Sequence, residues 1–159
     1  MTAEDYACAL ARHFEGCVLH PYQDPAGFWT IGYGERFLRN GETVGPDTAP
    51  ITQPEADAML AERIADIIRE IDGMMTVPLS PAQTGAIGDF CYNLGPEAFR
   101  FSSLRRQIEI GDNAAITADW LEWDHAHVDG KFVVLPGLRA RREAEAHLFT
   151  TGELLPGIA

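Results

Sequence analysis

The chain has 159 residues, of which 46% are hydrophobic and 23% are charged, and its formal net charge is -12. This length and composition predict a globular protein that can bury a core of its own and act as a monomer. The strong negative charge argues against nucleic acid or an anionic membrane as the main partner.

Targeting signals are not recognisable at the start of the chain. The first residues, MTAEDYACALARHFEG, mix acidic with apolar side chains and fit neither a secretory signal nor an uncleaved anchor. No apolar run reaches the ~18 residues of a membrane-spanning helix, so stable membrane insertion is not expected. We therefore expect the protein to stay in the cytoplasm unless another protein releases it. The widely spaced Cys8, Cys17 and Cys91 argue against a disulfide framework.

The first third of the chain changes from a helical to an extended pattern. A helix is predicted from Thr2, its N-cap, to Gly16, which ends it. Short extended segments over residues 18–34, with turns at DPAG and RNGE, indicate a small antiparallel sheet of two or three strands. A capping box that starts at Thr52 predicts a long helix over residues 53–72, long enough to join two lobes.

The remainder of the chain has a helical pattern with short breaks. Helices are predicted over 81–93, 101–110, 113–124 and 138–150, whereas LGPEAF is predicted to be a turn and DGKFVVLPG a loop. The predicted fold class is α+β, in one domain over 1–159. Its parts are an N-terminal lobe with a small antiparallel sheet (1–52), a connecting helix (53–73) and a helical C-terminal lobe (74–159).

Three polar residues near the N-terminus suit acid and base chemistry. Glu15 ends the first helix, where the helix dipole and apolar neighbours disfavour a negative charge. Asp24 opens a turn, where backbone donors favour an ionised carboxylate, and Thr30 follows on the returning strand, where it can hold a water. Two carboxyl groups in contrasting surroundings suit a general acid and a general base. The same spacing would arise if Glu15 were only a solvated helix end, Asp24 part of an Asx-turn and Thr30 a strand-forming residue. Spacing alone therefore leaves both interpretations open.

The stretch from Glu15 to Gly34, EGCVLHPYQDPAGFWTIGYG, resembles the active-site region of the phage-type lysozymes, or endolysins, of glycoside hydrolase family 24. The catalytic signature of that family is Glu, eight residues, Asp, five residues, Thr, and Glu15, Asp24 and Thr30 match it. Further segments match in the same order as far as Phe149, including VPLSPAQTGAIGDFCYNLGPEAF and LPGLRARREAEAHLF.

The resemblance implies a lysozyme-like, two-lobed fold with the substrate cleft between the lobes, and no cofactor. It implies hydrolysis of the β-1,4 bond between N-acetylmuramic acid and N-acetylglucosamine in peptidoglycan, with inversion in most members. Glu15 would protonate the leaving oxygen, Asp24 would activate or position water, and Thr30 would orient that water. It also implies that a holin or another route releases the enzyme to the periplasm or cell wall.

Other residues carry alternative interpretations. Arg141 matches a family arginine that reaches the catalytic glutamate, but an exposed base or a structural ion pair would look the same. Asn93 matches the motif F-N-x-G and either faces the cleft or ends its helix. Trp29 either stacks on a sugar or fills the core. The segment 124–129, DHAHVD, has the residue types of a metal site, yet the family needs no metal and none is expected.

Three other functions fit parts of the sequence. A lytic transglycosylase would cut the same bond without water, a non-catalytic module would only bind the cell wall, and a chitinase would act on a similar glycan. The net charge of -12 also departs from the positive charge common in phage endolysins. We therefore expect binding to depend on the cleft and on the more basic C-terminal half, with activity on cells strongest at mildly acidic pH.

Overall fold

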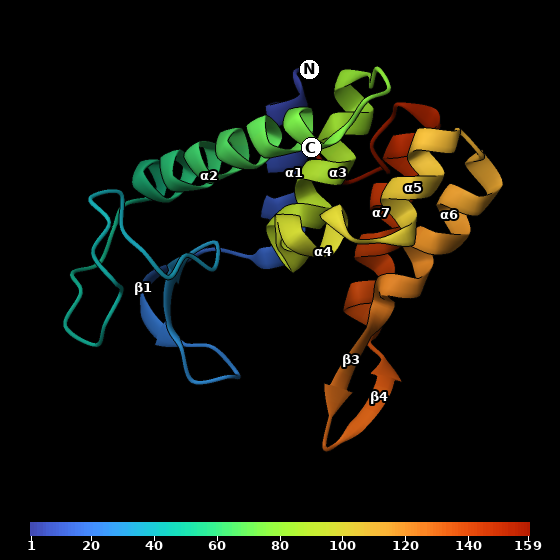
Figure 1. The fold of residues 1–159 in the computed structure, drawn as a ribbon. Coiled ribbons are helices and arrows are strands. Elements are labelled where there is room, and N and C mark those ends of the chain that lie inside the picture. The colour runs from blue at the N-terminus through green and yellow to red at the C-terminus, as the bar shows by residue number, and fades with distance from the viewer.

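A computed structural model describes residues 1–159 as two lobes joined by a long helix (Figure 1). The sheet lobe contains β1 (Val18–Gln23) and β2 (Trp29–Gly32), and α2 (Gln53–Met74) connects it to the helical lobe. The other elements are α1 (Ala3–Glu15), α3 (Pro81–Leu94), α4 (Pro96–Arg100), α5 (Ser103–Ile110), α6 (Asn113–Leu121), the short 3-10 helix η1 (Glu122–Asp124), β3 (His125–Val128), β4 (Lys131–Val134) and α7 (Pro136–Thr151). None of these helices combines the length and apolar character needed to cross a membrane.

Capping boxes begin the three helices that frame the molecule. The side chains of Thr2, Thr52 and Ser80 each accept a hydrogen bond from the backbone three residues later, and the side chain there accepts one in return. Each box satisfies two backbone N–H groups that a helix start leaves without partners. The predicted starts of α1 and α2 are therefore confirmed, and α2 extends two residues beyond its predicted end.

The small sheet is an antiparallel pair of strands, and its register determines the positions of the polar residues near the turn. Tyr22 pairs with Thr30, and the strands are joined through the DPAG turn, in which the Gly27 N–H donates to the Asp24 carbonyl over 2.9 Å. Gly27 has φ +86°, a conformation that side chains with a Cβ rarely adopt. The turn and register together place Asp24 and Thr30 at one end of the sheet.

The helical lobe contains most of the core. Its largest hydrophobic cluster comprises 20 buried residues, all but Ile158 from helices. Within it α1 packs closely on α3, because a Cβ added at Gly85 would lie 2.5 Å from the Cβ of Tyr6. The first helix is thus part of the helical packing, although its last residue leads into the sheet. A separate group of three residues, Ile31, Val44 and Met59, packs the sheet onto α2.

The predicted turn at LGPEAF is wrong, because this segment contains α4. Pro96 occupies the first turn of that helix, where its missing N–H costs no hydrogen bond, and Phe99 is buried in the main core. The next helix begins at Ser103 rather than residue 101, since the side chain of Ser102 caps it by accepting from the Arg105 N–H.

The predicted loop at DGKFVVLPG is also wrong. Strands β3 and β4 form an antiparallel hairpin that projects from the helical lobe (Figure 1). Its two-residue turn has positive φ at both positions, +49° at Asp129 and +76° at Gly130. An Asp-Gly pair of this kind favours a tight hairpin, because both residues tolerate the left-handed region. The last helix consequently begins at Pro136, two residues earlier than predicted.

Candidate active site

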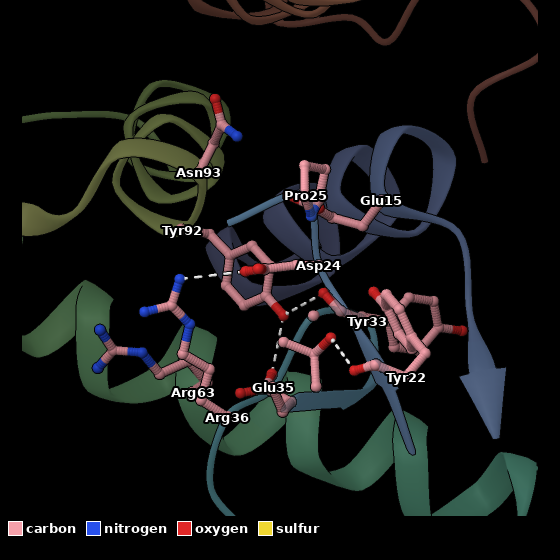
Figure 2. Close-up of a pocket in the computed structure, with 12 residues that line it drawn as sticks. Glu15, Tyr22, Asp24, Pro25, Tyr33, Glu35, Arg36, Arg63, Tyr92 and Asn93 are labelled. Carbon is pink, nitrogen blue, oxygen red and sulfur yellow. Dashed lines mark hydrogen bonds and ion pairs between the residues drawn. The ribbon is translucent and has the colours of Figure 1, made fainter. Parts of the chain in front are cut away.

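One cavity of about 450 Å³ brings together residues from both lobes (Figure 2). Its walls come from α1, the sheet and the segment that follows it, α2 and α3. They consist of Glu15, Tyr22, Asp24, Pro25, Thr30, Tyr33, Gly34, Glu35, Arg36, Arg63, Tyr92 and Asn93. Glu15, Asp24 and Thr30, which the sequence singles out, therefore lie around one space.

Asp24 is positioned by the turn that it opens. Its Oδ1 accepts hydrogen bonds from the backbone N–H groups of Ala26 and Phe28, both over 2.9 Å, and Arg36 Nη2 lies 3.2 Å from Oδ2. These backbone hydrogen bonds, first that from Phe28, hold the pKa of Asp24 below its usual value. Arg36 also lies over the Phe28 ring, 3.9 Å from its centroid. Asp24 is accordingly an ionised carboxylate at neutral pH.

Thr30 is buried on β2, with 3% of its surface exposed. Its hydroxyl donates to the backbone carbonyl of Tyr22 over 3.2 Å, which fixes the direction of the O–H bond. A hydroxyl group whose proton is already donated can still accept hydrogen bonds through its oxygen lone pairs. Thr30 can therefore accept a hydrogen bond from a water in the cavity.

Glu15 ends α1 and is held by an arginine from the other end of the chain. Arg141 Nη1 lies 2.5 Å from Glu15 Oε1, so the predicted contact is present. The other oxygen faces Gly34, because a Cβ added to Gly34 would lie 3.9 Å from Glu15 Oε2. One carboxyl oxygen is thus fixed by the helical lobe, whereas the other is directed toward the cavity.

Behind Glu15 lies a buried ionic cluster. Arg141 places Nε and Nη2 on the two oxygens of Asp89, over 2.8 and 2.6 Å, and Arg142 Nη2 lies 2.7 Å from Glu145 Oε1. All four of these side chains are at most 3% exposed. Burial raises the pKa of Glu145 well above its usual value. With Glu15, the cluster contains three carboxyl groups and two guanidinium groups, so it is electrically neutral when one carboxyl is protonated.

A third carboxyl group, Glu35, belongs to the same cavity. Its Oε1 lies 2.8 Å from the Tyr92 hydroxyl oxygen, which also lies 2.9 Å from the backbone carbonyl oxygen of Tyr33 (Figure 2). Burial raises the pKa of Glu35 above its usual value. Sequence reasoning missed this residue, although its place directly after TIGYG was a usable signal.

Asn93 and Trp29 have different surroundings. Asn93 lines the cavity, and its Oδ1 accepts a hydrogen bond from Arg142 Nη2 over 3.0 Å, so it connects the cavity to the ionic cluster. Trp29 does not line the cavity. It packs on the small core of Ile31, Val44 and Met59, because alternate residues of a strand face opposite sides of the sheet. The sugar-stacking role considered for Trp29 is therefore not supported at this cavity.

No residue of the DHAHVD segment lines the cavity: Asp124 ends η1, and the others belong to the hairpin. The His125 ring stacks on Phe132 with centroids 4.7 Å apart, and His127 packs on the same ring at 5.1 Å. Asp124 pairs with Arg139 at 3.0 Å. These contacts account for the polar residues as hairpin packing and ion pairing.

Comparisons with known proteins indicate the family of the chain. A family model described as Phage lysozyme matches residues 12–145. The endolysin of Acyrthosiphon pisum secondary endosymbiont phage 1 is 37% identical over 149 residues, which are 94% of this chain and 98% of that protein.

Two solved structures share the fold. An endolysin from Escherichia coli O157:H7 phage FAHEc1 has a TM-score of 0.87 at 26% identity, with 98% of this chain and 97% of that chain covered. The muramidase domain of SpmX from Asticaccaulis excentricus has a TM-score of 0.79 at 31% identity, with 91% and 95% covered. On the family match, the relative and the shared fold, the chain belongs to the phage lysozyme family and is a lysozyme-type hydrolase of peptidoglycan.

Proposed function

We propose that the protein is a muramidase that hydrolyses the β-1,4 bond between N-acetylmuramic acid and N-acetylglucosamine in peptidoglycan. The observation that supports this proposal most is the single cavity lined by Glu15, Asp24 and Thr30. The hairpin brings Asp24 and Thr30 together, whereas Glu15 ends α1 and reaches the same cavity from a different element. The name of the similar muramidase domain points to the same bond.

The water would be activated on the sheet side of the cavity. The Thr30 hydroxyl donates its hydrogen bond to the Tyr22 carbonyl, so its oxygen can accept one hydrogen bond from the water. Asp24, held ionised by the turn, can accept the other and then the proton itself. Both water protons are then engaged, which leaves the lone pairs of the water for attack on the anomeric carbon.

The proton for the leaving oxygen would come from the helical side. Arg141 fixes Oε1 of Glu15, which leaves Oε2 to face the cavity. An arginine beside a carboxyl group favours the ionised form. Here Asp89 shares that arginine, and the cluster has more carboxyl than guanidinium groups. Glu15 is thus the carboxyl group of this set that lines the cavity, the position that a proton donor to the leaving oxygen requires.

We also propose inversion at the anomeric carbon, as the family resemblance implies. In an inverting reaction the base delivers water on the face opposite the leaving group, so acid and base must be separate groups. Asp24 and Thr30 on the hairpin and Glu15 at the end of α1 meet this requirement. We further propose that residues 1–159 act as one lysozyme-like domain and as a monomer. The endolysin name of the relative supports release from the host cytoplasm to the cell wall, by a holin or another route.

Product analysis tests the proposed reaction. Purified peptidoglycan is digested in water enriched in heavy oxygen, and the fragments are identified by mass spectrometry. The proposal predicts reducing N-acetylmuramic acid ends that carry one heavy oxygen. Anhydro ends, lighter by one water, would identify a transglycosylase, and reducing N-acetylglucosamine ends would identify the wrong bond. Chitooligosaccharides are digested in parallel, and faster cleavage of these would favour a chitinase.

A further inference from the structure

Glu35 is a half-buried carboxyl group in the cavity for which the proposed reaction has no role. It follows β2 and belongs to the sheet lobe, whereas its hydrogen-bond partner Tyr92 belongs to α3. No arginine forms an ion pair with Glu35, although Arg63 lines the same cavity. Burying an ionised carboxylate without a positively charged partner is costly, so the burial of Glu35 must be stabilised in another way.

The Tyr92 hydroxyl group has two oxygen neighbours but only one proton to donate. Its oxygen is 2.9 Å from the Tyr33 carbonyl oxygen and 2.8 Å from Glu35 Oε1. A carbonyl can only accept, and a tyrosine hydroxyl has one proton to donate. With that one proton, both contacts are separate two-centre hydrogen bonds if Tyr92 donates to Tyr33 and accepts from Glu35. The Glu35 carboxyl must then be protonated.

The surroundings of the pair agree with a neutral Glu35. Burial raises the pKa of Tyr92, so that its hydroxyl keeps its proton. Burial also raises the pKa of Glu35 and outweighs the Tyr92 hydrogen bond and the charge of Arg63, which lower this pKa. The nearby Glu15 raises it further. The charged and titratable groups around Glu35 in the cavity are Glu15 of α1, Asp24, Tyr33 and Arg36 of the sheet lobe, Arg63 of α2 and Tyr92 of α3.

We propose that Glu35 is a positioning residue of the reaction: its protonated carboxyl group donates to Tyr92, which donates to the Tyr33 carbonyl, and this chain holds the two lobes in register. Tyr33 and Glu35 flank Gly34, which faces Glu15, and Tyr33 follows the strand that carries Thr30. Tyr92 precedes Asn93 on α3, the helix that also carries Asp89. The chain of hydrogen bonds therefore connects the water-activating side of the cavity with the side that holds Glu15.

Ionisation of Glu35 would break this arrangement. A carboxylate can only accept, so Tyr92 would turn its proton to Glu35 and leave the Tyr33 carbonyl without that donor. It would also place a negative charge in the cavity with Glu15. Because the folded state binds the Glu35 proton more tightly than the unfolded state, folded-state stability falls as pH rises from about 4.5 through the raised pKa.

A stability measurement tests the protonation without any reference to catalysis. Thermal unfolding of wild type, Glu35→Gln and the control Glu70→Gln is followed from pH 4.5 to 8. The glutamine amide can donate to Tyr92 but cannot ionise. We expect the Tm of Glu35→Gln relative to wild type to rise by at least ~2 °C between the two ends of the range. Glu70, exposed on α2, should give a constant difference. If Glu35→Gln behaves as Glu70→Gln does, Glu35 is not protonated and the inference is wrong.

Kinetics test the positioning role, which rests on the proposed function. Rates on purified peptidoglycan are measured against pH for wild type, Glu35→Gln and Glu35→Ala. The alanine variant should lose about 10-fold in kcat, with the glutamine variant restoring part of the loss and extending activity to higher pH. Equal losses in both variants, with an unchanged pH profile, would exclude positioning by a proton. Failure of the proposed function itself would appear separately, as no hydrolysis by wild type.

Discussion

The two sides of the cavity hold their carboxyl groups by different means. Asp24 depends on its neighbours in the chain, since its backbone donors lie two and four residues away. Glu15 depends on Arg141, which lies 126 residues away and is itself held by the buried Asp89. The sheet side is held by local contacts, whereas the helical side is assembled by contacts between distant parts of the chain.

This difference predicts that the two sides respond differently to substitution. A buried ion pair is costly to break, because the remaining partner stays desolvated and unpaired. An exposed pair contributes little, because water replaces the lost partner. Substitutions on the helical side should therefore lower both stability and activity, whereas those on the sheet side should lower activity alone.

Replacing Arg141 should have the largest effect on stability. Arg141→Met removes the partner that Asp89 and Glu15 share, and we expect the free energy of unfolding to fall by about 3–5 kcal/mol. Chemical denaturation measures this change. Arg100→Met is the control, since Arg100 and its partner Glu97 are 41% and 71% exposed, and its effect should be small. Equal effects of the two substitutions would contradict the distinction between buried and exposed pairs.

Gly85→Ala should have the next largest effect, because it separates α1 from α3. The new Cβ would lie 2.5 Å from the Tyr6 Cβ and 2.9 Å from the Ala3 carbonyl oxygen. We expect unfolding to become easier by about 1–3 kcal/mol and activity to fall, because Glu15 moves with α1 relative to Asp89. Gly73→Ala has no atom within 4 Å of its new Cβ and should instead be stabilising by ~0.5–1 kcal/mol. The same sign for both variants would count against the close packing of α1 on α3.

Asp24→Asn should change stability least while removing most of the activity. The amide oxygen can still accept from Ala26 and Phe28, so the turn should survive, but the base is lost. We expect the rate on peptidoglycan to fall by about 10²–10⁴ and the denaturation midpoint to stay close to that of wild type. A large loss of stability would show that the sheet side is not independent of the rest of the fold.

The parts of the molecule that depend on short-range chemistry were predictable from sequence. Capping boxes at Thr2 and Thr52 and the DPAG turn involve residues three or four positions apart, and each appears in the structure. The hairpin over 125–134 has a similar local signal in Asp129-Gly130, but the polar His125 and His127 obscured its strand pattern.

The ionic cluster and the third carboxyl were not predictable in this way. Asp89 sits in an apolar helix, GAIGDFCYNL, and nothing nearby indicates that its partner is Arg141, 52 residues later. Glu35 directly follows TIGYG, which is a signal for its place beside the site, but its contact with Tyr92, 57 residues away, has no signal in the sequence. Such contacts follow from the packing of α3 and α7, which residue patterns do not specify.

The comparison of wild type with Glu15→Gln on purified peptidoglycan tests the central claim most directly. Glutamine preserves the shape of the side chain and can still contact Arg141, but it cannot deliver a proton. Turbidity loss should slow by about 10²–10⁴ with an unchanged circular dichroism spectrum, whereas the control Glu4→Gln, on the first turn of the same helix, should match wild type. Equal rates for wild type and Glu15→Gln would contradict the assignment of Glu15 as the acid.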